Sequence, residues 1–144
     1  MKEARKLMAK TINMSHGSGG KAMRDLIEDL FVTTFDNPQL NCLEDQARFD
    51  LADLQKHGEQ LAFTTDSYVV DPLFFPGGNI GTLAVNGTVN DLAVSGAKPL
   101  YLSCGMIIEE GFPLSDLEKI TQSIAKSAKE AKVKIVTGDL KVVE

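Results

Sequence analysis

The sequence predicts an α+β or α/β sandwich in which helices cover one face of a sheet. Segments with helical spacing of apolar residues alternate along the chain with strand-like segments, and residues 100–109 alternate to give one strongly apolar face. A chain of 144 residues can bury roughly two thirds of its unfolded surface, which suits one compact domain and makes two domains cramped.

The first half of the chain is predicted to contain one helix and two strands. Residues 22–35 carry apolar side chains at helical spacing, and the glycine-rich residues 15–21 precede this helix directly. Asp-Asn-Pro at 36–38 breaks the pattern. A short strand is expected at 47–51 and a better one, rich in Thr, Tyr and Val, at 61–70.

A second helix is predicted from an Asn79 cap to about Ser95, after the Pro- and Gly-rich turn at 72–78. It carries Gly81 and Gly87 in its interior, where each glycine costs about 1 kcal/mol relative to alanine. Close packing against these two positions is the expected compensation.

The last third of the chain is predicted to form a strand, a helix and a strand. Cys104 falls among the alternating residues of the first strand and reads as a core residue. Ser115-x-x-Glu118 has the form of a capping box for a helix that continues to Ala131, and residues 133–137 form the next strand.

Composition excludes several classes of function. The net charge of -5 and the lack of a basic stripe argue against nucleic acid or an anionic membrane as the main partner. No segment is long and apolar enough to span a bilayer, and residues 1–10 lack the apolar core of a secretion signal. Cys42 and Cys104 have neither metal-ligand nor redox spacing, so a cytoplasmic location is expected.

The glycine-rich segment at 15–21 suggests phosphate binding. Glycine lets backbone amides approach a phosphate closely, and Lys21 can add a positive charge. A Walker A loop is excluded because Ser15 and Ala22 occupy the positions that need Gly and Ser or Thr, and a match to the dinucleotide fingerprint lacks the preceding strand. The alternative is a flexible turn that starts a helix. His16 either contacts a phosphate or helps to fold the loop.

Four aspartates lie beside predicted elements and outside simple runs of surface charge. They are Asp45, Asp66, Asp91 and Asp139. Asp66 is the clearest case, because an aspartate within a strand loses β propensity and must be paired or bound to a metal if it is buried. Each could instead be a cap or turn residue. Together with the glycine loop they suggest carboxylates for Mg²⁺, which commonly bridges protein oxygens and substrate phosphates.

Long motifs in this chain resemble the HypE family of nickel–iron hydrogenase maturation proteins. The matching segments are HGSGG (16–20), TTDSYVVDPLFFPGGNIG (64–81), NDLAVSGA (90–97) and TGDLKVV (137–143). The segment from Asp66 to Asn79 distinguishes this family from other ATP-using PurM-like enzymes, such as aminoimidazole ribonucleotide synthetase, selenophosphate synthetase and thiamine monophosphate kinase. The resemblance runs from about Met14 to the last residue.

The resemblance implies a PurM-like N-terminal domain with a four-stranded mixed sheet that pairs with its counterpart in a homodimer. It implies a glycine loop and helix over residues 1–40 and an ATP-binding and dimerisation domain over residues 41–144. The cofactors would be ATP and Mg²⁺. The implied metal ligands are Asp45, Asp66, Asp91 and Asp139, and the implied nucleotide contacts are Gly17, Ser18, Gly19, Gly20, Lys21, Asn90 and Lys141, with Lys21 also a possible catalytic residue.

Members of the HypE family accept a carbamoyl group from HypF on a C-terminal cysteine and use ATP to dehydrate it to a thiocyanate, the source of iron-bound cyanide. HypF and the HypC–HypD complex are the partners that the resemblance implies. The chain ends at Glu144, without the family's second domain and modified cysteine, so this polypeptide alone is expected to make no thiocyanate. Half of a related ATP-dependent synthetase or kinase, and a module for self-association only, remain alternatives.

Overall fold

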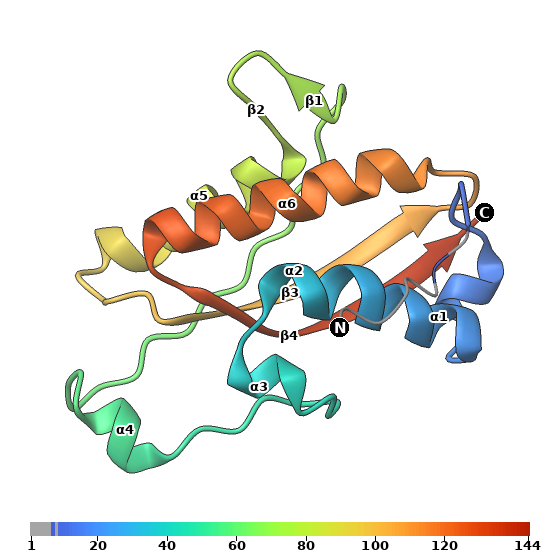
Figure 1. Cartoon of the computed structure of the whole chain (residues 1–144). Helices are drawn as coiled ribbons and strands as arrows, with labels where there is room; N and C mark the ends of the chain where they lie inside the picture. The colour runs from blue at the N-terminus through green and yellow to red at the C-terminus, as the bar shows by residue number, and fades with distance from the viewer. Residues whose placement is uncertain (1–6, 8) are drawn as a thin grey trace.

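A pair of long parallel strands forms the centre of the computed structural model, which describes residue 7 and residues 9–144 (Figure 1). Strand β3 (Tyr101–Glu109) pairs with β4 (Lys134–Val143) from Tyr101 opposite Lys134 to Glu109 opposite Val143. Helix α6 (Leu114–Ala131) connects them. Parallel neighbours need such a crossover, so residues 101–143 form a β-α-β unit.

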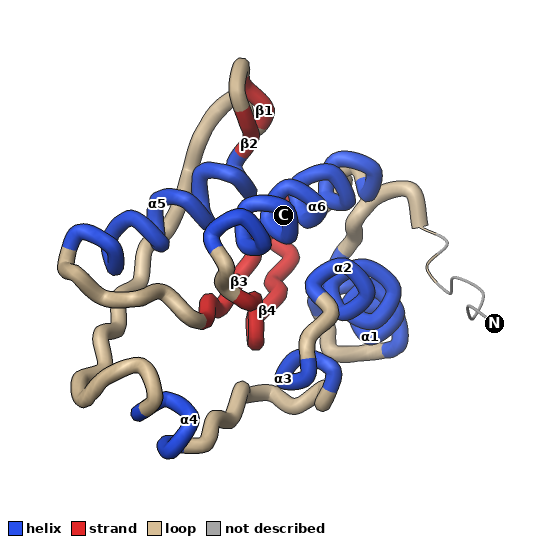
Figure 2. Tube along the Cα trace, turned by 60° about the vertical axis from the view of Figure 1, so that its left-hand side comes forward, coloured by secondary structure: helices blue, strands red, loops and turns tan. Residues whose placement is uncertain are grey.

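Helices α5 (Ile80–Val94) and α6 lie side by side over one face of this strand pair (Figure 2). Their buried apolar side chains meet those of the strands in one cluster, which includes Val85, Leu102, Ile124 and Ile135. Asn79 caps α5 as predicted, since its side-chain oxygen accepts a hydrogen bond of 2.9 Å from the Gly81 amide. The predicted α+β class, with helices on one face of a sheet, is confirmed.

The predicted helix at 22–35 is confirmed as one continuous helical segment. It consists of α1 (Lys21–Leu26), the π-helical η2 (Ile27–Val32) and α2 (Thr33–Phe35), and it follows the short 3₁₀ turn η1 (Met14–Gly17). Leu26 and Leu30 pack against Leu140 and Val142 of β4 in a second apolar cluster. The helix therefore lies along β4 (Figure 1).

Short elements complete the described chain. They are the helices α3 (Pro38–Asn41) and α4 (Leu51–Gln55) and the strands β1 (Phe74–Phe75) and β2 (Gly78–Asn79), which pair as an antiparallel hairpin. The basic N-terminal stretch considered above lies largely outside the described residues. Within the described residues, no helix is both long and apolar enough to cross a membrane.

Residue 7 and residues 9–144 do not form a single four-stranded sheet. The described residues contain two separate two-stranded sheets, and the strands predicted at 47–51 and 61–70 are wrong. Residues 61–70 have no ladder partner, and residues 62–67 are separated from β3 by a cavity. The Thr, Tyr and Val content of that segment favours an extended chain, but a strand also needs a neighbour at hydrogen-bonding distance.

The predicted capping box of the last helix is also wrong. Helix α6 begins one residue before Ser115, with Pro113 at its N-cap and no side-chain capping bond. The Leu114 amide donates a hydrogen bond of 3.0 Å to the carbonyl of Lys10, far away in sequence. Ser115 thus lies inside the first turn of the helix and not at its cap, and a tertiary contact satisfies the first backbone donor.

Candidate functional site

Two cavities lie against the strand pair, and Asp139 of β4 lines both. The first, of about 620 Å³, separates β3 and β4 from the helical segment 21–35. The second, of about 510 Å³, separates β3 from residues 62–67. Both volumes fall within the roughly 300–1,000 Å³ that is typical of small-molecule sites.

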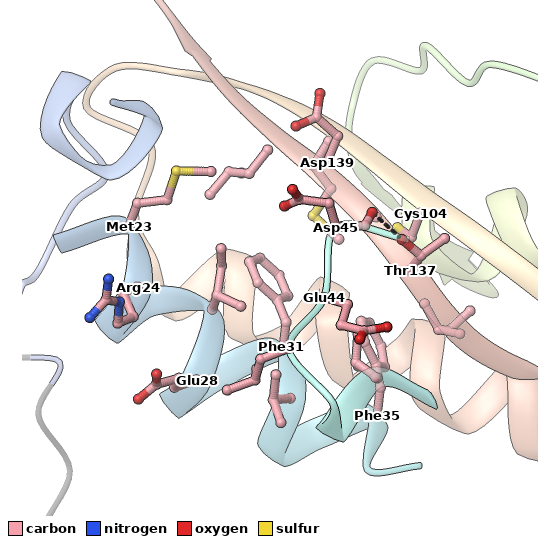
Figure 3. A pocket seen from close by; sticks show the side chains of 18 of the residues that line it. Met23, Arg24, Glu28, Phe31, Phe35, Glu44, Asp45, Cys104, Thr137 and Asp139 are labelled. Atoms are coloured by element: carbon pink, nitrogen blue, oxygen red, sulfur yellow. Dashed lines mark hydrogen bonds between the residues drawn. The ribbon is translucent and has the colours of Figure 1, made fainter. Parts of the chain in front are cut away.

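The first cavity has an apolar wall and an acidic rim (Figure 3). Met23, Phe31 and Phe35 extend into it from the helix, and Glu44 and Asp45 come from the loop that passes across its opening. The Thr137 hydroxyl donates a hydrogen bond of 3.3 Å to the Asp45 carbonyl, which fastens that loop to β4. Asp45 is thereby held on the same side of the strand pair as the glycine loop.

Cys104 contributes to the wall of the first cavity as a neutral thiol. Burial raises the pKa of its thiol to about 11. A thiol with this pKa is protonated at neutral pH, and the thiolate is the nucleophilic form. The prediction that Cys104 is a core residue agrees with its place beside the apolar cluster.

The glycine loop begins as a tightly hydrogen-bonded turn. His16 is 3% exposed, and its Nδ1 accepts a hydrogen bond of 3.1 Å from the Asn13 amide. The Asn13 side chain accepts in return from the amides of η1, which gives a capping box. His16 therefore helps to fold the loop.

The middle of the loop is open and weakly bonded. Gly19 has φ +80° with free space around it, lines the first cavity, and donates its amide to the thioether of Met23 at 3.2 Å. A thioether is a weak acceptor, so a phosphate oxygen is a better partner for this amide. Gly17, in contrast, is packed closely against β4, because a Cβ there would lie 2.9 Å from the backbone nitrogen of Val142.

The remaining loop residues are hydrogen-bonded locally. The Ser18 hydroxyl donates to the Ser15 carbonyl at 3.0 Å, and Gly20 precedes α1. The Lys21 ammonium lies 2.5 Å from the carboxylate of Asp25; the Lys21 side chain is 83% exposed and the Asp25 side chain 14% exposed. The exposed ammonium is therefore accessible to a second anion beside the loop.

The second cavity is polar. Asp66, Ser67 and Lys141 line it together with Asp139. The Lys141 ammonium donates to the Asp139 carboxylate at 2.8 Å, and this hydrogen bond is the main cause that lowers the pKa of Asp139 below its usual value. Asp139 is therefore ionised at neutral pH and is paired with the Lys141 ammonium.

Tyr68, from the segment that carries Asp66, packs on α5, the helix that carries Asp91, and the sequence contained only an indirect sign of this contact. Its hydroxyl shares a hydrogen bond of 3.2 Å with the Thr88 hydroxyl of α5. Burial is the main cause that raises the pKa of the Tyr68 phenol, and the charges of Asp66 and Asp91 add to the rise. Both carboxylates are thus near enough to act on the phenol. The sign in the sequence was Gly87, which the ring of Tyr68 covers.

The four predicted metal-binding aspartates do not form one cluster. In the part of the chain that the structure describes, no three His, Cys, Asp or Glu side chains are placed to hold a metal ion together. Asp45 and Asp139 share the first cavity, Asp66 and Asp139 share the second, and Asp91 lies exposed on α5 next to Asn90, outside both cavities.

This donor set fits a nucleotide that brings its own Mg²⁺. Mg²⁺ is commonly bound through one or two carboxylates together with substrate phosphates, so pairs of aspartates suffice where a dedicated protein cage would need more. The two pairs that the cavities bring together, Asp45 with Asp139 and Asp66 with Asp139, are such pairs. The open Gly19 amide supplies a donor of the kind that phosphates need.

Comparison with known proteins agrees with this description. The family model of AIR synthase related proteins, N-terminal domain, matches residues 43–144. Carbamoyl dehydratase HypE of Escherichia coli K12 is 60% identical over 133 residues, which are 92% of this chain and 40% of that protein. The chain thus spans about two fifths of the length of the curated relatives it matches.

Solved structures resemble the chain as well. A hydrogenase maturation protein HypE in complex with ATP is 57% identical with a TM-score of 0.84, covering 90% of this chain and 37% of that one. A HypE–HypF complex contains a chain that is 54% identical with a TM-score of 0.56, covering 83% of this chain and 36% of that one.

Proposed function

This chain belongs to the AIR synthase related proteins, whose N-terminal domain it matches over residues 43–144, and on that premise we propose that it is the ATP-binding portion of a HypE-type carbamoyl dehydratase. The observation that carries the proposal is the likeness, at 57% identity and a TM-score of 0.84, to a HypE structure in complex with ATP. The open Gly19 amide and the carboxylates of the two cavities support it.

The glycine loop would hold the phosphates. Gly17, Ser18, Gly19 and Gly20 would present backbone amides, and Lys21 would exchange Asp25 for a phosphate oxygen. Asn90 and Lys141 would make further polar contacts. Lys141 already neutralises Asp139, so its ammonium is placed to reach an anion beside β4.

The carboxylates would hold Mg²⁺ in this proposal. Asp66 and Asp139 would supply oxygens from the second cavity, Asp91 from the exposed surface of α5, and Asp45 from the rim of the first cavity. Bound ATP with Mg²⁺ supplies the phosphoryl group that turns an amide oxygen into a leaving group, which is the chemistry needed to dehydrate a thiocarboxamide to a thiocyanate. The residues of this chain would contribute positioning and electrostatic stabilisation.

A titration of this chain with ATP, with and without Mg²⁺, tests the proposal. We expect saturable binding that Mg²⁺ strengthens. Asp139→Asn should remove part of the gain from Mg²⁺, and the control Asp53→Asn, which changes an exposed ion pair with Lys56 on α4, should not. Absence of saturable ATP binding by the unmodified chain would refute the proposal.

We also propose that a second copy of the chain covers residues 61–70 and the exposed face of β3. Large apolar side chains are exposed there: Leu61 (82%), Phe63 (90%), Val69 (99%) and Ile107 (77%). Apolar side chains exposed to this extent along one segment mark an interaction surface. Sedimentation at high protein concentration should give a dimer, and a monomer would contradict the proposal.

The same exposed surface favours a second candidate function, a module for self-association without nucleotide. Dimers that bind no ATP would support that candidate over the first. HypF and HypC–HypD would be partners of the complete protein under the first proposal. The expectation that these 144 residues alone make no thiocyanate stays a prediction, which a carbamoyl-transfer assay with HypF and ATP tests.

A further inference from the structure

We propose that Tyr68 is a positioning residue that fastens the segment carrying Asp66 to helix α5, and thereby sets the separation of Asp66 and Asp91 for a nucleotide-bound divalent cation. The proposal rests on the Mg²⁺–ATP function proposed above. It assigns a role to a side chain that joins the segment of Asp66 to the helix of Asp91 and belongs to neither cavity wall.

The fit between Tyr68 and Gly87 is the first observation. A Cβ added to Gly87 would lie 2.9 Å from the Cε1 and Cζ atoms of Tyr68 and closer still to its hydroxyl oxygen. Contacts under 3.0 Å are essentially never made by a real Cβ, so the Tyr68 ring occupies the place of a side chain on α5. The helix carries a glycine, at a cost in helix propensity, at the position where the ring needs room.

A hydrogen bond of the Tyr68 hydroxyl group fixes the orientation of the ring on α5. The hydroxyl shares this hydrogen bond with Thr88, the residue that follows Gly87 on α5. Tyr68 is half-buried there, in a segment whose neighbours Ser67 and Val69 are exposed. The ring and the hydroxyl are therefore both fixed by adjacent positions of one helix.

Residues 61–70 have little else to hold them. They form no ladder, and a cavity lies between residues 62–67 and β3. Within the described part of the chain, the bond between Tyr68 and Thr88 is the only hydrogen bond found between residues 61–70 and the rest of the protein. The position of this segment relative to α5 thus depends on Tyr68.

Asp66 is only two residues from Tyr68, so the position of Tyr68 restricts the position of Asp66. Two residues of extended chain span about 7 Å, and side chains two apart point to the same face. Asp91 lies three residues after Thr88, about one helical turn along α5. Fastening Tyr68 to Thr88 therefore brings the backbone of Asp66 to the part of α5 that carries Asp91.

The test measures ATP affinity of the full chain by calorimetric titration in the presence and absence of Mg²⁺. We expect Tyr68→Phe to lower the Mg²⁺-dependent gain in affinity about fivefold, the effect of one lost hydrogen bond, and Tyr68→Ala to lower it tenfold or more. Affinity for ATP without Mg²⁺ should change less than twofold. Asn86→Ala, an exposed change beside Gly87 on α5, is the matched control and should behave as the unmodified chain.

A second readout follows the geometry without nucleotide. Nitroxide labels on Thr65→Cys and Val94→Cys, in a Cys42→Ser background, report the distance between the segment and α5. The distance distribution should be narrow in the parent and broad with Tyr68→Ala. The milder Tyr68→Phe keeps the test valid if the alanine variant is poorly folded.

The outcomes separate this inference from the function on which it rests. Tyr68 variants that keep the full gain from Mg²⁺ while the parent shows that gain would overturn the role of Tyr68 and leave the proposed function intact. A parent chain that binds no Mg²⁺–ATP would refute the proposed function and with it the cation role of Tyr68. An unchanged distance distribution in Tyr68→Ala would overturn the positioning itself.

Discussion

Replacing Gly87 with alanine should destabilise this protein, although the same change stabilises most helices. Alanine in a helix interior is about 1 kcal/mol more favourable than glycine. Here the added Cβ would lie 2.9 Å from two ring carbons of Tyr68, so the ring must leave its place. Overpacking of this kind costs about 1–3 kcal/mol, and the lost bond to Thr88 adds about 1 kcal/mol. The net expectation is a loss of about 1–3 kcal/mol.

The sign should reverse once the ring is removed. In a Tyr68→Ala background the three atoms nearest to the new Cβ are gone, and Gly87→Ala should then stabilise the fold by about 0.5–1 kcal/mol through helix propensity. The two substitutions would therefore be coupled by about 1.5–4 kcal/mol. Urea unfolding of the four variants, followed by circular dichroism, measures this coupling.

Gly81→Ala is the matched control on the same helix. A Cβ there would lie 2.7 Å from the Ile120 carbonyl, a backbone atom, so this change should destabilise the protein with or without Tyr68. A Gly87→Ala variant that stabilises the parent chain, or that has the same effect in both backgrounds, would refute the packing role of the Tyr68 ring.

Three further predictions concern other parts of the chain. His16→Asn keeps an acceptor near the place of Nδ1, so it can still accept a hydrogen bond from the Asn13 amide, whereas His16→Gln cannot. The Asn variant should therefore be about 1 kcal/mol more stable than the Gln variant in the same unfolding assay. Equal stabilities would contradict the role of His16. Because the pKa of the Cys104 thiol is raised from 9.0 to about 11, its contribution to stability is present below pH 9 and is lost as the pH rises toward 11. Thiol alkylation at pH 8, followed by mass spectrometry, should modify the exposed Cys42 first. Faster labelling of Cys104 would contradict this expectation. Phe63→Glu places a charge on a side chain that is 90% exposed, so it should leave the stability of the single chain nearly unchanged while shifting sedimentation toward monomer; an unaltered dimer would show that residues 61–70 are not at the interface.

Local patterns predicted the helices well because a helix satisfies its backbone within its own segment. The spacing of apolar residues identified the segments around α1, α5 and α6, and the side chain of Asn79 capped α5 as expected. The strand at 100–109 was equally clear, since its apolar face packs against helices of the same chain.

The errors arose where a distant part of the protein supplies the partner. Residues 61–70 have strand-like composition, yet a ladder requires a second strand at hydrogen-bonding distance, and the nearest one is across a cavity. At α6, the carbonyl of Lys10 bonds the Leu114 amide, so the helix starts without help from Ser115.

By itself the sequence determined the helices, the class of fold and the residue types of the candidate site, because each of these depends on neighbours along the chain. Only the tertiary structure decided how those residues are distributed: Asp139 between two cavities, Asp45 and Asp66 on one cavity each, and Asp91 on the helix that Tyr68 contacts. The glycine at position 87 within a helix predicted close packing at that position, but it did not identify the partner residue. The partner is a phenol 19 residues earlier, and steric fit in three dimensions selects it.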